Sequence, residues 1–286
     1  MFRDTDEPLE ESSISKYSSL IFPTDRLKSF DGALLVKARA MRKVLGIIGC
    51  GAIGTVIAKA VDNKIVNCDR VILYDVIGEK AEKLGRSLSI ETIVVSGVNE
   101  MIELNPNIII EAASQQAVKE YANKILEHNI HLIVLSVSAL LDLDVKSNKI
   151  HIPSGAIGSL DAISSAALAG INEALLTTRK NPRSLGRSDK KEKIVYEGPA
   201  EEAVKIFPKN INVAATLALA VQPAKLKVRI ISDPKVTRNI HEIKIKWKHG
   251  EMLLKFINET HPENPKTSAL AAWSAINLLK NLLEEN

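Results

Sequence analysis

The sequence predicts an α/β protein in which a doubly wound, Rossmann-like parallel sheet is followed by a second α+β domain. Three observations lead to this prediction. Apolar strand-like runs alternate with helix-like segments between residues 44 and 135, a glycine-rich turn follows the first run, and longer alternating strands appear after about residue 150. Continuously apolar strands separated by helices are typical of parallel sheets covered on both faces.

The composition is that of a globular protein with two domains. The chain has 286 residues, of which 45% are hydrophobic and 25% charged, and it contains no apolar run of the ~20 residues that crossing a bilayer needs. Two cysteines without metal-ligand spacing argue against a zinc site and favour the reducing cytoplasm. A net charge of +4 and an aromatic content of 4% do not indicate a nucleic-acid-binding surface.

The first forty residues differ from the rest, because they mix both charge signs with Ser and Thr and show little periodicity. One interpretation is that Met41 is the true initiator and the leader a start-site artefact. The other is a real extension that packs on a partner. The first is favoured, and poor order is expected in either case.

A glycine-rich turn separates the first strand, which begins near Val44, from a helix-like segment over residues 55–61. Gly49 permits the tight turn, Gly51 allows close approach to a pyrophosphate, and Gly54 lets the helix pack closely on the sheet. The helix N-terminus faces the phosphate charge. We therefore expect a dinucleotide to contact Gly49, Gly51, Ala52, Ile53 and Gly54.

The second strand, over residues 70–74, ends at an acid, Asp75, roughly 20 residues after the last glycine. A carboxylate there binds the adenosine ribose and repels a 2′-phosphate, and the next two residues are apolar. NAD is therefore expected as the cofactor. Arg70 and Lys80 lie near enough to keep NADP possible.

The remaining segments of this half alternate in the same way. We expect helices over 77–88, 99–104 and 115–127, and strands over 91–95, 107–111 and 130–135. Ligands of such sheets bind beyond the carboxyl ends of the strands. Residues 111–115 and 136–140, which follow two of these strands, should therefore lie at the cofactor edge.

The second half reads as an open mixed or antiparallel sheet with helices. A short strand over 149–152 and an Ala/Ser-rich helix ending at Ala169 precede it. Strands are expected over 172–178, 193–197, 225–231, 239–247 and 250–258, and helices over 200–206, 212–220 and 267–283. The expected domains are 41–152 for the nucleotide and 153–266 for catalysis. The helix over 267–284 either stays with the second domain or returns to the first.

Five stretches of the second half resemble the L-aspartate dehydrogenase family of archaea and bacteria. With the glycine turn, the resemblance covers essentially residues 41–286, whereas 1–40 have no counterpart. The family usually has Gly where Ser138 stands, which puts the local turn and the pocket's width in question. The stretches are Ile152-Pro-Ser-Gly-Ala-Ile-Gly-Ser-Leu-Asp-Ala162, Thr177-Thr-Arg-Lys180, Phe207-Pro-Lys-Asn-Ile-Asn-Val-Ala-Ala215, Asp233-Pro-Lys-Val-Thr-Arg-Asn-Ile-His-Glu-Ile243 and Asn264-Pro-Lys-Thr-Ser-Ala-Leu270.

The resemblance implies the reversible, NAD(P)-dependent oxidative deamination of L-aspartate to oxaloacetate and ammonia through iminoaspartate. It also implies a link to NAD biosynthesis, because iminoaspartate is a precursor of quinolinate, and a homodimer or larger assembly. By the same resemblance His241 is the catalytic base, and Ala156 and Asn212 contact the cofactor.

The chemistry of these residue types fits the implied roles. Imidazole, with an ordinary pKa of ~6.5, suits the deprotonation of an amine and the activation of water. The turn around Ala156 carries two glycines that expose backbone N–H groups. Asn212 and Asn210 open a helix, so capping is the alternative role of each. The other five histidines lack a supporting motif.

A dianionic substrate needs cations or several donors. The candidates all lie in the family-like stretches, although a solvated surface charge is the alternative for each: Arg179, Lys180, Lys209, Arg238 and Lys266. Glu111 and Asp161 are expected to orient their neighbours rather than to transfer protons.

Two other classes of function stay open from the residues alone. One is another two-domain NAD(P) oxidoreductase, similar to homoserine dehydrogenase or dihydrodipicolinate reductase. The other is a catalytically silent NAD-binding regulator, which would bind the nucleotide without turnover.

Overall fold

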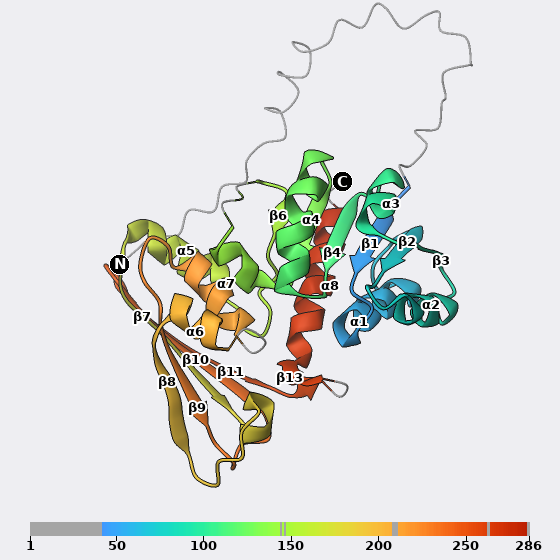
Figure 1. Cartoon of the computed structure of the whole chain (residues 1–286). Coiled ribbons are helices and arrows are strands. Elements are labelled where there is room, and N and C mark those ends of the chain that lie inside the picture. The colour runs from blue at the N-terminus through green and yellow to red at the C-terminus, as the bar shows by residue number, and fades with distance from the viewer. Residues whose placement is uncertain (1–41, 144, 146, 208–210, 262–263, 285–286) are drawn as a thin grey trace, which may run out of the picture. The chain divides into compact units, whose positions relative to one another are not determined.

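The computed structural model describes residues 42–143, 145, 147–207, 211–261 and 264–284, with the backbone alone at 261 and 264–267 (Figure 1). All of the described residues belong to one compact unit, Arg42–Asn286. The expectations for the leader 1–40 and its Met41 therefore lie outside the described residues. Everything below concerns the unit Arg42–Asn286.

The first part of this unit is a six-stranded sheet whose paired strands all run parallel, in the order β3-β2-β1-β4-β5-β6. The order reverses beside β1, so the sheet is doubly wound, as predicted. The strands are β1 (Val44–Ile48), β2 (Arg70–Tyr74), β3 (Glu91–Val94), β4 (Ile108–Glu111), β5 (His131–Val134) and β6 (Ile150–His151).

Helices cover both faces of this sheet, and a separate apolar core lies on each face. β1 and β4 are buried along their whole length because both sides of the sheet are covered. The connecting helices are α1 (Ala52–Asp62), α2 (Gly78–Arg86), α3 (Val98–Glu103) and α4 (Gln115–Glu127).

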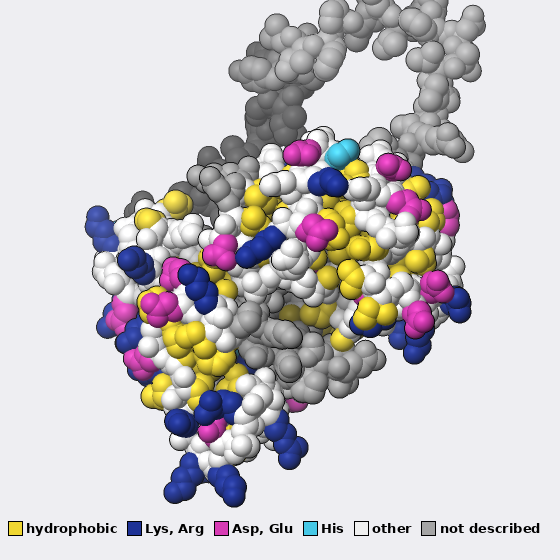
Figure 2. Space-filling model, in the orientation of Figure 1, with side chains coloured by type: hydrophobic (Ala, Val, Ile, Leu, Met, Phe, Trp, Pro, Cys, Tyr) yellow, Lys and Arg dark blue, Asp and Glu magenta, His cyan; other side chains and the backbone are white. Residues whose placement is uncertain are grey.

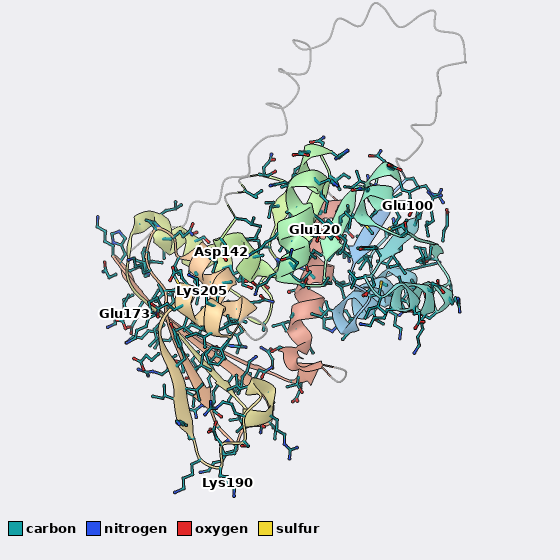
Figure 3. All side chains as sticks on the ribbon, in the orientation of Figure 1. Glu100, Glu120, Asp142, Glu173, Lys190 and Lys205 are labelled. Atoms are coloured by element: carbon teal, nitrogen blue, oxygen red, sulfur yellow. The ribbon has the colours of Figure 1, made fainter. Side chains whose placement is uncertain are left out.

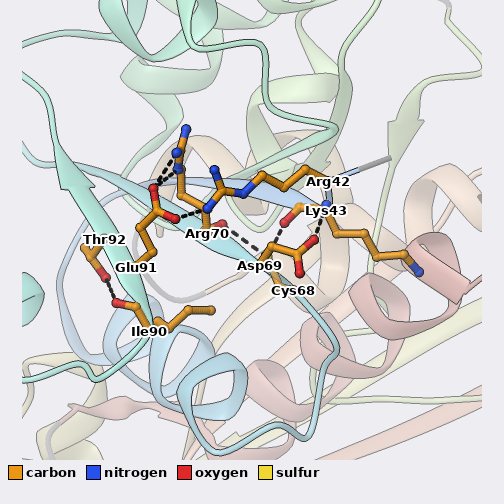
Figure 4. Close-up of polar contacts among 8 residues, drawn as sticks. All are labelled: Arg42, Lys43, Cys68, Asp69, Arg70, Ile90, Glu91 and Thr92. Carbon is orange, nitrogen blue, oxygen red and sulfur yellow. Dashed lines mark hydrogen bonds and ion pairs between the residues drawn. The ribbon is translucent and has the colours of Figure 1, made fainter. Parts of the chain in front are cut away.

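Charged contacts hold the amino ends of β1, β2 and β3 together (Figure 4). Arg70 donates from Nε to Glu91 at 2.6 Å, Arg42 also pairs with Glu91, and the Asp69 carboxylate accepts from the Lys43 N–H at 2.7 Å. Arg70 therefore lies at the opposite end of β2 from Asp75. Arg70, one of the two cations considered for binding a 2′-phosphate, therefore pairs with Glu91 and lies away from Asp75, the predicted ribose ligand.

The second part is a five-stranded sheet in the order β11-β10-β7-β9-β8. β7 and β9 are parallel and the other neighbours antiparallel, so of the two expected forms the mixed sheet is correct. The strands are β7 (Ile171–Lys180), β8 (Lys193–Pro199), β9 (Lys227–Ser232), β10 (Asn239–Trp247) and β11 (Gly250–Asn258).

One face of this sheet is covered by helices (Figure 1) and its side chains form a third apolar core. We call this the inner face. Residues of β7 and β10 alternate between it and the opposite, more exposed face. The covering helices are α5 (Leu160–Ala169), α6 (Ala200–Ile206) and α7 (Asn212–Ala220).

The sequence did not predict four short elements: the 3₁₀ helices η2 (Val137–Leu141) and η3 (Pro182–Leu185), and the paired strands β12 (Thr260–His261) and β13 (Asn264–Ser268). The last helix, α8 (Ala269–Glu284), consequently begins two residues later than expected. Thr260 pairs with Ser268, and the Ala269 N–H donates to the Glu259 carbonyl at 3.0 Å, which keeps the chain extended up to Ser268.

The outside of the unit carries charges of both signs. Six labelled side chains are all exposed: Glu100, Glu120, Asp142, Glu173, Lys190 and Lys205 (Figure 3). Lys and Arg gather around the β7–β8 connection (Figure 2), where Arg187 pairs with Asp189 at 2.5 Å. None of the helices formed by the described residues has the length and apolar character that crossing a bilayer requires.

Candidate active site

Two cavities of about 340 and 300 Å³ open at the carboxyl edge of the parallel sheet. They share Gly51, Ala112 and Ala113 as lining residues, so they meet at the glycine turn. We call the larger one the reaction cavity, because it also reaches the inner face of the second sheet, and the smaller one the ribose cavity. A dinucleotide is long enough to need such a pair of adjoining sites.

The glycine turn has the geometry of a phosphate cradle. Gly49 has φ +98°, which L side chains rarely adopt, and a Cβ at Gly54 would lie 1.9 Å from the Gly49 carbonyl oxygen. A Cβ at Gly51 would meet no atom within 4 Å, because it would enter the cavities. Ala52 and Ile53, the first residues of α1, line the reaction cavity with the helix N-terminus. These residues fit a pyrophosphate.

Asp75 lines the ribose cavity. Its carboxylate accepts from the Cys50 N–H at 2.8 Å and from the Ile77 N–H at 2.9 Å, which fixes its position. Lys80 lines the same cavity. An anion and a cation therefore both lie where the ribose of a dinucleotide would bind.

Glu111 ties together the two loops expected at the cofactor edge. Its side chain is only 1% exposed and accepts from the N–H groups of Ala113 and Ser114, both at 2.8 Å, and from the N–H and hydroxyl of Ser136 at 3.0 and 2.9 Å. Burial raises the pKa of this carboxyl, while the four hydrogen bonds oppose the rise. Both loops line the cavities, and Glu111 orients its neighbours, as expected.

A group of buried polar side chains interrupts the apolar inner face of the second sheet. Thr178 and Lys180 lie at the end of β7, Asn239 and His241 at the start of β10, and His241 pairs with Thr178 across the strands. Residues two apart share a face of a strand, so all four belong to the inner face. Farther along, the same face is apolar, with Ala174, Leu176, Ile243 and Ile245.

His241 is buried and lines the reaction cavity. Its Nδ1 lies 3.0 Å from the Thr178 hydroxyl oxygen, while its Nε2 has no hydrogen-bond partner among the described residues. Burial, and then the charge of Lys180, lower the pKa of His241 to about 3. The ring is therefore a neutral imidazole, and its Nε2 accepts a proton in the tautomer whose Nδ1–H donates to the Thr178 hydroxyl.

Of the expected substrate cations, the structure brings Lys180 to the reaction cavity. Burial lowers the pKa of this ammonium to about 8. Arg179 lies on the opposite face because side chains alternate along β7, and it pairs with Glu192 and Asp233 at 2.7 and 2.8 Å.

Of the remaining cation candidates, Arg238 alone has a described side chain, and it does not line the cavity. Arg238 is exposed and lies 3.2 Å from the carboxylate of Glu259. Lys209, and Asn210 with its expected capping role, lie outside the described residues, as does the side chain of Lys266.

Asn212 and Ala156 both line the reaction cavity. Asn212 is the first residue of α7, and its Oδ1 accepts from the Ser138 hydroxyl at 3.0 Å. Ser138 is buried in η2, and its hydroxyl holds the amide of Asn212. The Ala156 carbonyl accepts from Asn258 Nδ2 at 2.8 Å.

Sequence reasoning assigned no role to Thr178, Asn239 or Ser268. Asn239 donates from Nδ2 to the Ser268 hydroxyl oxygen at 3.2 Å, and Ser268 lines the reaction cavity. Thr178 is two residues before Lys180, and Asn239 is two residues before His241, so each pair lies on one face of its strand. This spacing is the sequence signal by which Thr178 and Asn239 could have been found. No group of His, Cys, Asp and Glu within the described ranges is suited to hold a metal ion.

Comparison with known proteins agrees with this architecture. Residues 49–151 match the family model of the homoserine dehydrogenase NAD-binding domain, and residues 161–282 match that of the aspartate dehydrogenase C-terminal domain. The chain is similar to the crystal structure of aspartate dehydrogenase from Thermotoga maritima, with a TM-score of 0.67, 31% identity, and coverage of 84% of this chain and 96% of that one.

The sequence relatives extend the similarity over the same region. L-aspartate dehydrogenase of Archaeoglobus fulgidus is 43% identical over 251 residues, covering 84% of this chain and 98% of the relative. That of Methanospirillum hungatei JF-1 is 42% identical over 248 residues, covering 83% and 96%. With a nucleotide-binding sheet, a matching C-terminal domain and these relatives, the chain belongs to the L-aspartate dehydrogenase family.

Proposed function

We propose that this chain is an L-aspartate dehydrogenase that oxidises L-aspartate to oxaloacetate and ammonia with NAD, with His241 as the catalytic base. The observation that carries this proposal is the unpartnered Nε2 of His241 in the cavity that adjoins the glycine turn. In this nucleotide-linked cavity, a neutral imidazole with a free ring nitrogen is placed to take a proton from an amine, and the carboxylates of a bound substrate would raise its low pKa.

The proposed chemistry has two steps. In the first, His241 Nε2 takes a proton from the substrate ammonium, and the Cα–H bond breaks as the C=N bond of iminoaspartate forms. NAD, when bound, supplies the acceptor for the hydride that leaves Cα. After His241 has released the ammonium proton to solvent, it removes a proton from water in the second step as the water oxygen attacks the imine carbon. His241 then gives that proton to the amino group, which leaves as ammonia as the hydroxyl loses its proton and the C=O bond of oxaloacetate forms.

The surrounding side chains orient this chemistry. Thr178 holds Nδ1 of His241 and so directs Nε2 to the cavity. Lys180 supplies a cation for a substrate carboxylate. Asn212, held by Ser138, offers its amide to the nicotinamide carboxamide, and the backbone at Ala156 borders the same position.

NAD is proposed over NADP because the Asp75 carboxylate would lie close to a ribose 2′-phosphate. Two backbone N–H groups hold this carboxylate in the ribose cavity. Lys80, which lines the same cavity, attracts a 2′-phosphate and supports some use of NADP. Release of the imine before hydration would connect the reaction to NAD biosynthesis through quinolinate.

A homo-oligomer is proposed from family habit and from the edge of the second sheet. β11 is an edge strand, and Leu253 and Ile257 on it are 69% and 50% exposed. Burial of such apolar side chains between copies would be favourable.

The test is the formation of NADH with L-aspartate, compared between the wild type and His241→Ala, with NADP in parallel. Removal of a general base lowers kcat by about 10²–10⁴-fold, whereas the dissociation constant of NAD should stay unchanged. The exposed His249 provides a matched control, since His249→Ala should keep full activity.

Other outcomes would separate the alternatives. NAD binding without turnover of aspartate, or of oxaloacetate with ammonia in reverse, would favour the silent regulator. Strong turnover of another amino acid such as homoserine would favour a different oxidoreductase.

A further inference from the structure

Ser268 occupies a position where an anion would be expected to bind. It is the last residue of β13, it is buried, and it lines the reaction cavity. The next residue begins α8, which is 16 residues long. The N-terminus of a helix carries a partial positive charge, so α8 begins with its positive end at this cavity.

The hydrogen bond to Asn239 determines what the Ser268 hydroxyl can do. Asn239, itself 1% exposed, donates from Nδ2 to the hydroxyl oxygen of Ser268 at 3.2 Å. A serine hydroxyl has one hydrogen, and here its oxygen acts as the acceptor. That hydrogen is therefore available to donate to a group in the cavity.

Lys180 adds a full positive charge to the same region. Ile240 pairs with Arg179 across β10 and β7, so the next residue on each strand brings Asn239 beside Lys180. Both Lys180 and Ser268 line the reaction cavity, and Ser268 is bonded to Asn239. A cation, an oriented hydroxyl and a helix N-terminus thus occur together, which is the donor set of a carboxylate site.

A second observation points to a ligand in this cavity. The Nε2 of His241, a side chain 1% exposed, has no partner among the described residues and lies two positions from Asn239 on the same strand face. Buried polar atoms are nearly always hydrogen-bonded in folded proteins, so this nitrogen is expected to meet a bound molecule.

We propose that Ser268, held by Asn239 and acting with Lys180, binds one carboxylate of the dicarboxylate substrate and so selects dicarboxylates over monocarboxylates. This inference rests on the proposed function, since it assigns a subsite of the same cavity. Aspartate has two carboxylates, at C1 and in its side chain, and both present the same chemistry to these donors.

The test measures the inhibition constant of succinate and the KM for L-aspartate in the full-length wild type and in Ser268→Ala. Loss of one hydrogen bond to a charged group should raise both constants about tenfold or more. The dissociation constant of NAD should not change. Ser268→Thr keeps the hydroxyl and should restore most of the affinity.

A matched control and a second readout exclude a purely structural effect. Ser165→Ala removes an exposed serine hydroxyl of α5, which donates to the Asp161 carbonyl at 2.8 Å, and should leave both constants unchanged. A structural role for Ser268 would instead weaken NAD binding or lower the Tm while the succinate constant of the folded enzyme stayed the same, and that result would overturn the proposal.

Two monocarboxylates identify which carboxylate is bound. 3-Aminopropionate keeps only the side-chain carboxylate and L-alanine only the C1 carboxylate, and the one whose inhibition weakens in Ser268→Ala reports the carboxylate at this site. Either result supports the proposal. A wild type that oxidises aspartate beside a Ser268→Ala variant with an unchanged succinate constant would refute the subsite alone, whereas an inactive wild type would refute the proposed function.

Discussion

The buried polar residues of this chain mark its site. A buried polar group costs free energy unless it is hydrogen-bonded, so such residues are kept where a function needs them. Most of those in the described part of the chain line the reaction cavity or contact its lining: Glu111, Ser138, Thr178, Lys180, Thr216, Asn239, His241 and Ser268. Among them, burial and the charge of Lys180 lower the pKa of His241, and its unpartnered Nε2 is expected to meet a bound molecule.

Lys180 is expected to lower stability in the absence of substrate. Its pKa is about 8 in the folded state against 10.5 in a solvated chain, because burial disfavours the charged form. Lys180→Met, which removes the buried charge, should raise the free energy of unfolding by about 3 kcal/mol at pH 7. The same variant should lose turnover of aspartate.

The pH dependence provides the check. Between pH 8 and 10.5 the unfolded state holds more protons on Lys180 than the folded state, so wild-type stability rises with pH there. The gain in the free energy of unfolding of Lys180→Met over the wild type should be complete below pH 8 and disappear as the pH approaches 10.5. Urea denaturation at pH 7 and at higher pH measures it, and a variant less stable than wild type at both values would contradict the expectation.

At the scale of elements, the connections after the strands hold the cofactor site. The turn after β1, the Glu111 loop after β4 and the Ser136 loop after β5 all follow carboxyl ends of the parallel sheet and line the cavities. Parallel strands bring these ends to one edge, so residues far apart in sequence become neighbours. Glu111 then links two of the loops through hydrogen bonds.

Two alanine substitutions in the glycine turn should separate folding from binding. Gly54→Ala would bring its Cβ within 1.9 Å of a backbone oxygen, so α1 must move and the Tm should fall by several degrees. Gly51→Ala has an ordinary φ of −80° and open space around the Cβ, so its Tm without NAD should stay close to wild type. Its affinity for NADH should nevertheless fall about tenfold or more, since the methyl group fills the phosphate position.

Fluorescence titration with NADH and thermal denaturation of both variants measure the difference. The interpretation of the turn as a phosphate cradle would be rejected if Gly51→Ala bound NADH as tightly as the wild type.

At the scale of the whole unit, α8 connects the reaction cavity to the nucleotide-binding sheet. Its first turn contributes Ala271 to the cavity, and its later residues Ala275, Ile276 and Leu279 share an apolar core with α1. Figure 1 shows α8 extending from β13 along the parallel sheet. The substrate region and the cofactor region are therefore linked by a single continuous helix.

The contribution of this helix can be tested with two Leu→Ala variants. Leu279 is fully buried, so Leu279→Ala should lower the free energy of unfolding by about 3 kcal/mol through lost burial and a residual cavity. That corresponds to a Tm lower by roughly 6–12 °C for a unit of this size. Leu168 in α5 is 93% exposed, and Leu168→Ala should change stability by less than about 0.5 kcal/mol. Equal effects of the two would argue against a tightly packed α8.

Much of the fold could be predicted from sequence periodicity. The buried strand runs, the glycine turn and the five alternating strands of the second half all formed within a few residues of their expected bounds. The short 3₁₀ helices and the β12–β13 pair were missed because they lack enough residues to establish a period. The start of α8 was misplaced because a tertiary contact, Thr260 with Ser268, keeps Ser268 extended.

The residue types of the site could largely be predicted from the sequence. Which of these residues line the reaction cavity could not. Arg179 and Lys180 are adjacent cations, and the sequence gives no reason to prefer either as a ligand of the substrate carboxylates. The alternation of β7, together with which face the helices cover, sends Lys180 to the reaction cavity and Arg179 to Glu192 and Asp233. Ser268 lies in a family-like stretch but was assigned no role, since its role depends on a hydrogen bond from Asn239 and on the start of α8.

The sequence by itself determined the two-domain α/β architecture, the nucleotide-binding turn with its acid, and the identity of the chemical groups, because these depend on local periodicity and residue type. Only the tertiary structure decided which of the candidate groups meet. Burial beside Lys180 makes His241 a neutral imidazole, Ser138 holds Asn212, and β13 brings Ser268 to Asn239. Such effects arise from desolvation and from contacts between residues distant in the chain, and neither is encoded in any one segment.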